Sequence, residues 1–198
     1  MLNIVVLISG GGSNLRALLE RAARPDAGYR IVAVGADNQA AGLQHAADFG
    51  VPSFVVSPTD FADRQAWGRA LAAKIVACGI SKDAGLIVSA GFMRVLPADF
   101  VHEFTPRIIN THPALLPLFP GAHAVEDALA AGATKTGATV HFVDEGVDTG
   151  RTIAQCEVDI LQGETVAVVH EKIKVVERQL LVDVVQDIAT GKIALLAD

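Results

Sequence analysis

The chain has 198 residues, a formal net charge of −6 at pH 7 and 51% hydrophobic residues, enough for one domain with a large buried core. It contains no run of Lys or Arg, and this acidic balance disfavours binding to nucleic acid or to anionic membranes. Cys78 and Cys156 lie far apart, and the apolar segment 2–8 is too short for a signal peptide or a membrane span. We therefore expect a reduced, cytoplasmic protein.

Apolar runs typical of buried strands alternate with amphipathic stretches typical of helices through the first 112 residues. The expected strands cover residues 2–8, 30–35, 51–56, 85–90 and 107–111. The expected helices cover residues 15–23, 40–49, 61–78 and 97–104, the third of them capped by Thr59-Asp60. This alternation predicts βαβ units and a parallel sheet.

The remaining part of the chain departs from this alternation. A helix at 123–131 is followed by strands at 137–143 and 152–160 with no helix between them, then by a long helix at 164–188 and a short strand at 192–196. Strands that follow each other without a crossover helix pair antiparallel. We therefore predict a single domain over residues 1–198. Its fold is a three-layer, Rossmann-like α/β fold whose mostly parallel central sheet has an antiparallel C-terminal edge.

A glycine-rich turn joins the first expected strand to the first expected helix, over Ser9 to Asn14. The backbone N–H groups at such a helix N-terminus carry partial positive charge and suit a phosphate. Leu15 stands where a dinucleotide-binding G-x-G-x-x-G motif has its third glycine, and the Lys of a triphosphate-binding loop is missing. We predict that Gly12, Ser13 and Asn14 hold a single phosphate, although a tight turn without a ligand can have the same sequence.

An amide and an imidazole lie two residues apart where the fifth expected strand meets a proline-rich loop. Positions i and i+2 of a strand point to the same face, so Asn110 and His112 project together. Pro113, Pro117 and Pro120 stiffen the loop that follows. An amide donor beside a titratable ring suits a reaction in which charge develops on a carbonyl oxygen. The alternative is that Asn110 and His112 have no catalytic role and only form hydrogen bonds with nearby backbone groups.

Ligands of open parallel sheets bind beyond the carboxyl ends of the strands. Residues 12–14, residues 93–96 and the Asn110/His112 pair each follow a predicted strand, so all three are expected to face one crevice. A catalytic histidine usually needs a carboxylate to orient it or balance its charge. One loop offers Asp144, Glu145 and Asp148, and their spacing alone does not choose among them.

The string from Asn110 to Gly121 resembles the signature N-x-H-P-S-L-L-P-x-[F/Y]-P-G of the folate-dependent formyltransferases. The prolines, the Leu pair and the Asn/His pair match in register, and the resemblance extends over about residues 2–190. Ala114 replaces the family's usual Ser, while Leu118 and Val125 stand where relatives often carry Lys and His. These departures make the site less polar than is usual in the family.

The resemblance implies roles for individual residues. It makes Asn110, His112 and Asp148 catalytic and places His141 at the site. It divides the domain into a nucleotide- and phosphate-binding half at about 1–105 and a catalytic and folate half at about 106–198. The residues implied to bind the ribonucleotide are Gly12, Ser13, Asn14, Lys174 and Glu177. The residues implied to bind folate are Arg64, Met93, Arg94, Val95, Leu96, Asn110 and Asp144.

The glycine-rich loop is similar to that of the family branch that acts in de novo purine biosynthesis. This branch transfers formyl from 10-formyltetrahydrofolate, a co-substrate, to the amine of glycinamide ribonucleotide. Asn110 and His112 would then bond the tetrahedral oxyanion, and Asp148 would relay protons through water. The resemblance implies small-molecule partners, a monomer or homodimer, and no metal, nucleic acid or membrane.

Two other interpretations remain open. Sister enzymes of the family transfer formyl to a tRNA-borne acceptor or hydrolyse formyltetrahydrofolate, but they normally carry an additional domain, for which we expect no room here. A non-enzymatic nucleotide-binding module, with Asp37 contacting a ribose after the second strand, would also suit the fold. It leaves Asn110, His112 and Asp148 unexplained.

Overall fold

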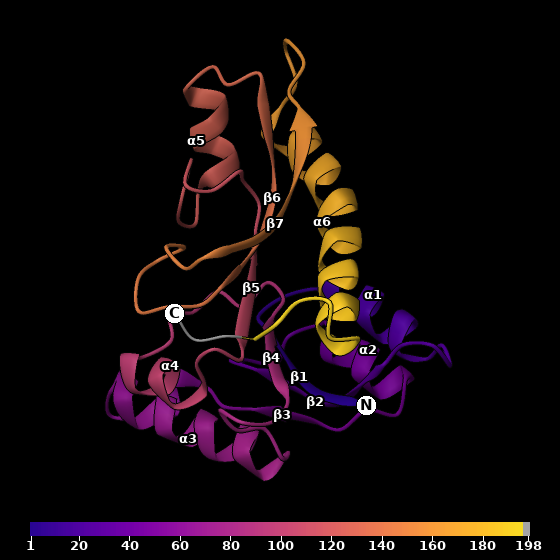
Figure 1. Cartoon of the computed structure of the whole chain (residues 1–198). Helices are drawn as coiled ribbons and strands as arrows, with labels where there is room; N and C mark the ends of the chain where they lie inside the picture. Colours follow the sequence, from indigo (N-terminus) through magenta and orange to yellow (C-terminus); the bar gives the residue numbers. More distant parts are fainter. Residues whose placement is uncertain (196–198) are drawn as a thin grey trace.

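The computed structural model describes residues 1–195 (Figure 1). The strands are β1 (Leu2–Ile8), β2 (Tyr29–Ala36), β3 (Ser53–Val55), β4 (Leu86–Ser89), β5 (Ile108–His112), β6 (Lys135–Phe142) and β7 (Thr152–Asp159). The helices are α1 (Ser13–Ala22), α2 (Leu43–Asp48), α3 (Arg64–Ala77), α4 (Ala98–Phe104), α5 (Ala124–Ala130) and α6 (Val166–Ala189), with a 3-10 turn η1 at Pro58–Asp60.

One seven-stranded sheet, in the order β3-β2-β1-β4-β5-β6-β7, runs through the domain. The pairs from β3 to β5 are parallel, whereas β5 with β6 and β6 with β7 are antiparallel. The predicted α/β fold with an antiparallel C-terminal edge is therefore confirmed. The antiparallel turn at β6 matters for function, because it brings His141 directly opposite Asn110 in the ladder.

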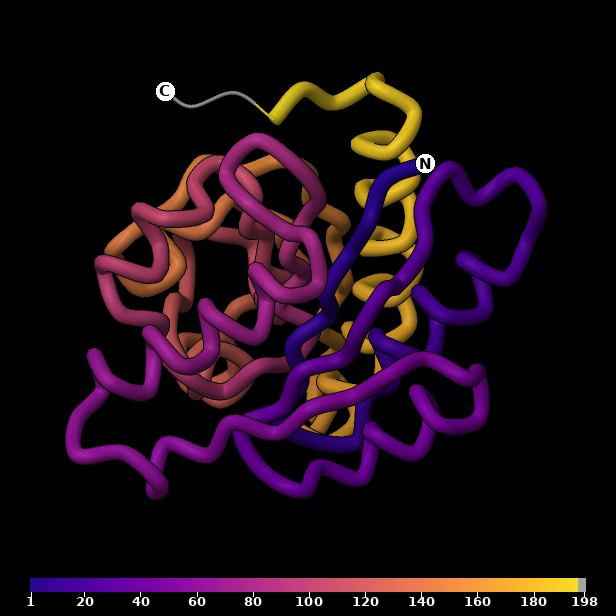
Figure 2. The backbone as a smooth tube through the Cα atoms, turned by 90° about the horizontal axis from the view of Figure 1, so that it is seen from below, coloured from indigo at the N-terminus to yellow at the C-terminus, as the bar shows by residue number. Residues whose placement is uncertain are grey.

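The interior strand β1 is apolar on both faces because helices cover both sides of the sheet. Ile4, Val6 and Ile8 pack in the cluster that includes α1 and the C-terminal half of α6. Val5 and Leu7 point the other way, into the cluster that includes α3 and α4. Figures 1 and 2 show α1 and α6 on one side of the sheet and α3 and α4 on the other. Period-2 alternation in a doubly covered strand accounts for its continuous hydrophobic sequence.

The long helix α6 is fixed at its C-terminal end beside the start of β1, as both views show (Figures 1 and 2). Leu181 and Val185 of this helix are fully buried in the core. Gln186 donates from Nε2 to the Asp26 carbonyl oxygen at 3.2 Å. Because this end is anchored, the preceding turns present Glu177 to the end of β5.

Several bounds differ from the predicted elements. Helix α2 covers only Leu43–Asp48 of the predicted range 40–49, and strand β3 only Ser53–Val55 of 51–56. Helix α3 begins at Arg64 rather than near residue 61, because Asp63 caps it by accepting from the Ala66 N–H at 2.7 Å, while Pro58–Asp60 forms the separate turn η1. Residues 192–195 form no strand, and the last residue of the strand predicted there, Leu196, lies outside the described residues. Within residues 1–195, no helix is long and apolar enough to cross a membrane.

Candidate active site

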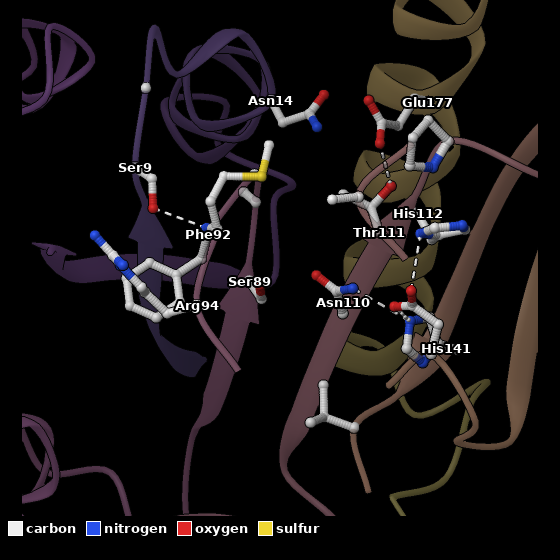
Figure 3. Close-up of a pocket in the computed structure, with 18 of the residues that line it drawn as sticks. Ser9, Asn14, Ser89, Phe92, Arg94, Asn110, Thr111, His112, His141 and Glu177 are labelled. Carbon is white, nitrogen blue, oxygen red and sulfur yellow. Dashed lines mark hydrogen bonds and ion pairs between the residues drawn. The ribbon is translucent and has the colours of Figure 1, made fainter. Parts of the chain in front are cut away.

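A cavity of about 530 Å³ opens where β1, β4 and β5 end, as the strand order predicts (Figure 3). Its wall is made by the loops after β1 and β4, the end of β5, the loop after β6 and one face of α6. The predicted segments 12–14 and 93–96 line it together with Asn110, His112 and Asp148. Segments far apart in sequence therefore share one site.

Strand β5 divides this cavity into two sides, because alternate side chains leave it in opposite directions. Asn110 and His112 point toward β6 and its loop, whereas Thr111 points toward α6. We call the first side the polar cluster, formed by Asn110, His112, His141 and Asp148. We call the second the glycine-loop side, formed by residues 10–14 with Thr111, Lys174 and Glu177.

The polar cluster is held together by direct contacts between side chains. Asp148 lies between two imidazoles, with Oδ2 3.3 Å from His112 Nδ1 and Oδ1 3.5 Å from His141 Nε2. Asn110 Nδ2 is 3.2 Å from the same His141 nitrogen. His112 and Asp148 are nearly buried, at 5% and 12% side-chain exposure. The three residues predicted to be catalytic thus meet, with His141 as a fourth member.

Backbone carbonyls define where the ring protons lie. His112 Nε2 is 2.8 Å from the Phe119 carbonyl oxygen, and His141 Nδ1 is 2.8 Å from the Phe142 carbonyl oxygen. A carbonyl only accepts, so both nitrogens carry hydrogen. The other nitrogen of His141, Nε2, lies within reach of both the Asn110 amide and Asp148 Oδ1. The other nitrogen of His112, Nδ1, faces the Asp148 carboxylate.

The backbone holds Asp148 in an unusual conformation. Its φ of 56° lies in the left-handed region, which non-glycine residues adopt only when the surroundings require it. Position 150 in the same loop requires glycine, because a Cβ there would lie 1.8 Å from the Phe142 carbonyl oxygen. The Gly121 N–H donates to Asp148 Oδ2 at 2.9 Å. The carboxylate is therefore aimed by its loop rather than by its own rotamer alone.

Opposing influences set the charge of Asp148. Burial raises its pKa, but the hydrogen bond with His141, the Gly121 N–H and the positive charge of His112 lower it by more, so the pKa ends below its ordinary value. A carboxylate that stays ionised beside an imidazole can take and return a proton without leaving its place.

The loop after β4 forms the facing wall and is anchored on both sides. The Met93 N–H donates to Ser9 Oγ at 2.8 Å, and the Ser9 N–H donates to the Gly91 carbonyl at 3.1 Å. Arg94 Nε donates to Asp37 Oδ2 at 2.6 Å, and this carboxylate is only 2% exposed. The predicted folate loop thus has a fixed backbone, while Met93 itself is 76% exposed.

The Arg94 contact removes one alternative interpretation. Asp37 is buried and occupied by Arg94 and by the Asn38 amide at 2.8 Å, so it is not available to contact a ribose.

Arg64 does not line the main cavity. It lines a neighbouring hollow of about 470 Å³ that shares Met93, Arg94 and Val95 with it. There Arg64 Nη2 donates to the Leu96 carbonyl at 2.8 Å.

The glycine-loop side is built mainly from backbone. Gly12 has a φ of 72°, and a Cβ there would lie 3.0 Å from Gly42 Cα, so the chain passes too closely for a side chain. No side chain caps α1, which leaves its first N–H groups without a capping partner. Asn14 is only 7% exposed, and its Oδ1 has no partner among the described residues. Figure 3 shows this amide facing Glu177 across the cavity.

One face of α6 completes the site. His170, Lys174 and Glu177 have the i, i+4, i+7 spacing of one helical face, and all three line the cavity. Lys174 also contacts Glu171 at 2.6 Å. His170 was not among the predicted site residues, although this spacing could have identified it. Neither was Thr111, which donates to Glu177 Oε1 at 2.7 Å.

Asp144 lines the cavity but its side chain is used within its own loop. Its Oδ1 accepts from the Gly146 N–H at 3.1 Å and from the Thr149 hydroxyl at 2.7 Å. It therefore shapes the loop that carries Asp148. The structure gives the three candidate carboxylates of this loop different surroundings. Asp148 enters the polar cluster, Asp144 braces the loop, and the exposed Glu145 contacts His102 of α4.

Comparisons with known proteins identify the family of the chain. The formyl transferase family model matches residues 2–185. A phosphoribosylglycinamide formyltransferase of Mycobacterium tuberculosis is 50% identical over 187 residues, covering 94% of this chain and 85% of that protein. The crystal structure of glycinamide ribonucleotide transformylase 1 from Symbiobacterium toebii superposes with a TM-score of 0.93 at 36% identity, covering 100% of this chain and 92% of that one. A phosphoribosylglycinamide formyltransferase from Brucella melitensis gives 0.88 at 37% identity, covering 98% and 99%. The chain belongs to the formyl transferase family.

Proposed function

We propose that this protein transfers the formyl group of 10-formyltetrahydrofolate to the amine of glycinamide ribonucleotide, a step of de novo purine biosynthesis. Family membership and the similarity to proteins of that name support the reaction class. The observation that carries the proposal is the position of the polar cluster. It lies in one cavity with both the anchored loop 91–96 and the phosphate-suited loop 10–14, so two substrates can meet at it.

In the reaction, the amine nitrogen attacks the formyl carbon, and the carbonyl electrons move onto oxygen. One Asn110 amide hydrogen is used by His141, which leaves the second for this oxyanion. The positive charge of His112 stabilises the same oxygen. A direct hydrogen bond from His112 requires one of its present partners, the Phe119 carbonyl or Asp148, to move away.

Asp148 balances the protons of the transfer. The attacking amine loses one proton, and N10 of the folate gains one as its bond to the formyl carbon breaks. Asp148 accepts the first and supplies the second, directly or through water, with His112 holding its other oxygen. His141 and Gly121 keep the carboxylate in place through this cycle.

The two sides of the cavity divide the ligands between them. Folate binds against residues 93–96, with its heterocycle near Asn110 and Asp144 and its tail toward Arg64. The phosphate binds the N–H groups of residues 12–14, and the remainder of the nucleotide reaches Lys174 and Glu177. Residues 1–198 act as one domain, a cytoplasmic monomer or homodimer. Its two halves, about 1–105 and 106–198, each contribute to both ligands.

The test is an assay of formyl transfer, in which the absorbance change of the folate product is the readout. Purified protein should produce tetrahydrofolate from the formyl donor only when glycinamide ribonucleotide is present. Formyl release without the nucleotide would instead indicate a hydrolase, and no release with any amine acceptor would refute the proposal.

A further inference from the structure

The contact between Thr111 and Glu177 has no role in the transfer described above. Thr111 Oγ1 donates to Glu177 Oε1 at 2.7 Å, and both residues are buried, at 7% and 8% exposure. They lie 66 residues apart in sequence, so only the packing of α6 on β5 brings them together. Both also line the cavity, on the glycine-loop side (Figure 3).

We propose that Thr111 is a positioning residue for substrate recognition. Its hydroxyl fixes Glu177 through Oε1, so that Oε2 is the oxygen that accepts hydrogen bonds from the sugar hydroxyls of the ribonucleotide. The proposal rests on the proposed function, because it assumes that a ribonucleotide occupies this side. It adds a residue that touches Glu177 and acts through it.

The surrounding groups favour a ligand that donates hydrogen bonds here. Asn14 Oδ1, which faces Glu177 across the cavity, is a buried acceptor without a partner within residues 1–195. Two acceptors on opposite walls suit hydroxyl groups and do not suit a phosphate oxygen. The phosphate then belongs at the backbone N–H groups of α1, and the sugar lies between Asn14 and Glu177.

Fixing Glu177 matters because a carboxylate on a long side chain has several rotamers. A buried acceptor that loses its donor also pays a desolvation cost and tends to reorient. Thr111 has a β-branched side chain on a strand, so its hydroxyl is itself held in one direction. The orientation of Glu177 is thus transmitted from the β5 backbone.

The experiment compares Thr111→Val, which is nearly isosteric, with the wild type. The KM for glycinamide ribonucleotide should rise about tenfold, while kcat and the KM for the formyl donor stay within about twofold. Thr111→Ser, which keeps the hydroxyl, should restore the nucleotide KM to within about twofold. The wild type should also prefer its substrate over an analogue without ribose ring hydroxyls, and Thr111→Val should reduce that preference.

Two further measurements separate positioning from packing. In a Glu177→Gln background, Thr111→Val should shift nucleotide binding by less than about twofold, because the two residues act as one unit. Thr136→Val is the matched control, since Thr136 is buried and its hydroxyl has no partner among the described residues. It should leave the nucleotide KM unchanged. If Thr111→Val does not fold, Thr111→Ala takes its place, and we expect the same rise in the nucleotide KM.

An unchanged nucleotide KM in Thr111→Val or Thr111→Ala would overturn the inference. So would a Thr111→Ser variant as weak as Thr111→Val, because keeping the hydroxyl would then not restore nucleotide binding. Either result with an active wild type leaves the proposed function intact. A wild type that transfers no formyl group would instead refute the proposed function itself.

Discussion

The two sides of the cavity are built by different means. The polar cluster consists of side chains from β5, β6 and the loop after it, and each member contacts another member directly. The glycine-loop side relies on backbone N–H groups fixed by α1, with a few side chains placed opposite them. Substitution of any one member of the polar cluster should disable the whole cluster, whereas substitution of one side chain on the glycine-loop side should only weaken binding. We therefore expect variants of the polar cluster to lower kcat, and variants of the glycine-loop side to raise the substrate KM.

The largest effect is expected from breaking the polar cluster. His112→Ala, Asn110→Ala and Asp148→Asn should each lower kcat by on the order of 10² or more, because each removes a group that stabilises charge in the transition state. The His112→Ala/Asp148→Asn double variant should fall by much less than the product of the single effects. Steady-state formyl transfer measures this, with circular dichroism as the folding control.

Asp144→Asn is the matched control for the carboxylate. The new side chain keeps an oxygen that can accept from the Gly146 N–H and the Thr149 hydroxyl, so kcat should stay within about threefold. A crippled Asp144→Asn, or a fully active and folded Asp148→Asn, would show that the wrong carboxylate has been chosen. Independent, multiplicative losses in the double variant would contradict a cluster that acts as a unit.

An intermediate effect is expected on the glycine-loop side. Asn14→Asp places a carboxylate opposite Glu177 and beside the phosphate site, so the nucleotide KM should rise by about tenfold while kcat changes little. Asn3→Asp makes the same change beside Arg30, outside the cavity, and should leave the KM unaltered. A drop in kcat with an unchanged KM would break the contrast between the two sides.

A smaller effect is expected at the anchor of the folate loop. Asp37→Asn removes the buried charge that holds Arg94 at 2.6 Å, so the loop should loosen and the KM for the formyl donor should rise roughly threefold to tenfold. Glu20→Gln breaks the exposed pair of Arg16 and Glu20 and should have no effect. A nucleotide KM that rises instead would mean that Asp37 serves the other ligand.

Local sequence patterns were sufficient to predict most of the strands, the mostly parallel sheet with its antiparallel edge, and the crevice. β-branched runs bounded by glycines marked the strands, and βαβ alternation gave a parallel sheet whose carboxyl ends meet. The strand period placed Asn110 and His112 on one face. The helix start at Arg64 was missed because Asp63 and Thr59-Asp60 are equally good caps by composition, and only packing selects between them.

Contacts between distant segments could not be derived in this way. The pairs Arg94–Asp37 and Thr111–Glu177 join residues 57 and 66 positions apart, and no periodicity relates them. Among the loop carboxylates, spacing left the choice open and family resemblance selected Asp148. Its place between two histidines follows from a left-handed backbone conformation and from Gly150, neither of which has a local hydrophobic signal. The polar cluster was therefore less predictable than the glycine-rich turn.

The smallest expected effect concerns acid stability and tests whether the cluster also supports the fold. The pKa of Asp148 is lower in the folded protein than its ordinary value near 4, so its ionised form stabilises the fold above the unfolded pKa, and that contribution is lost as pH falls through the folded pKa. Wild type should melt about 2–4 °C above Asp148→Asn at pH 5 to 7, and this gap should close below about pH 4. Melting curves across that range measure it. A gap that stays constant from pH 7 down to the lowest pH at which both proteins still fold would assign the difference to packing instead of charge and would leave the cluster with a catalytic role alone.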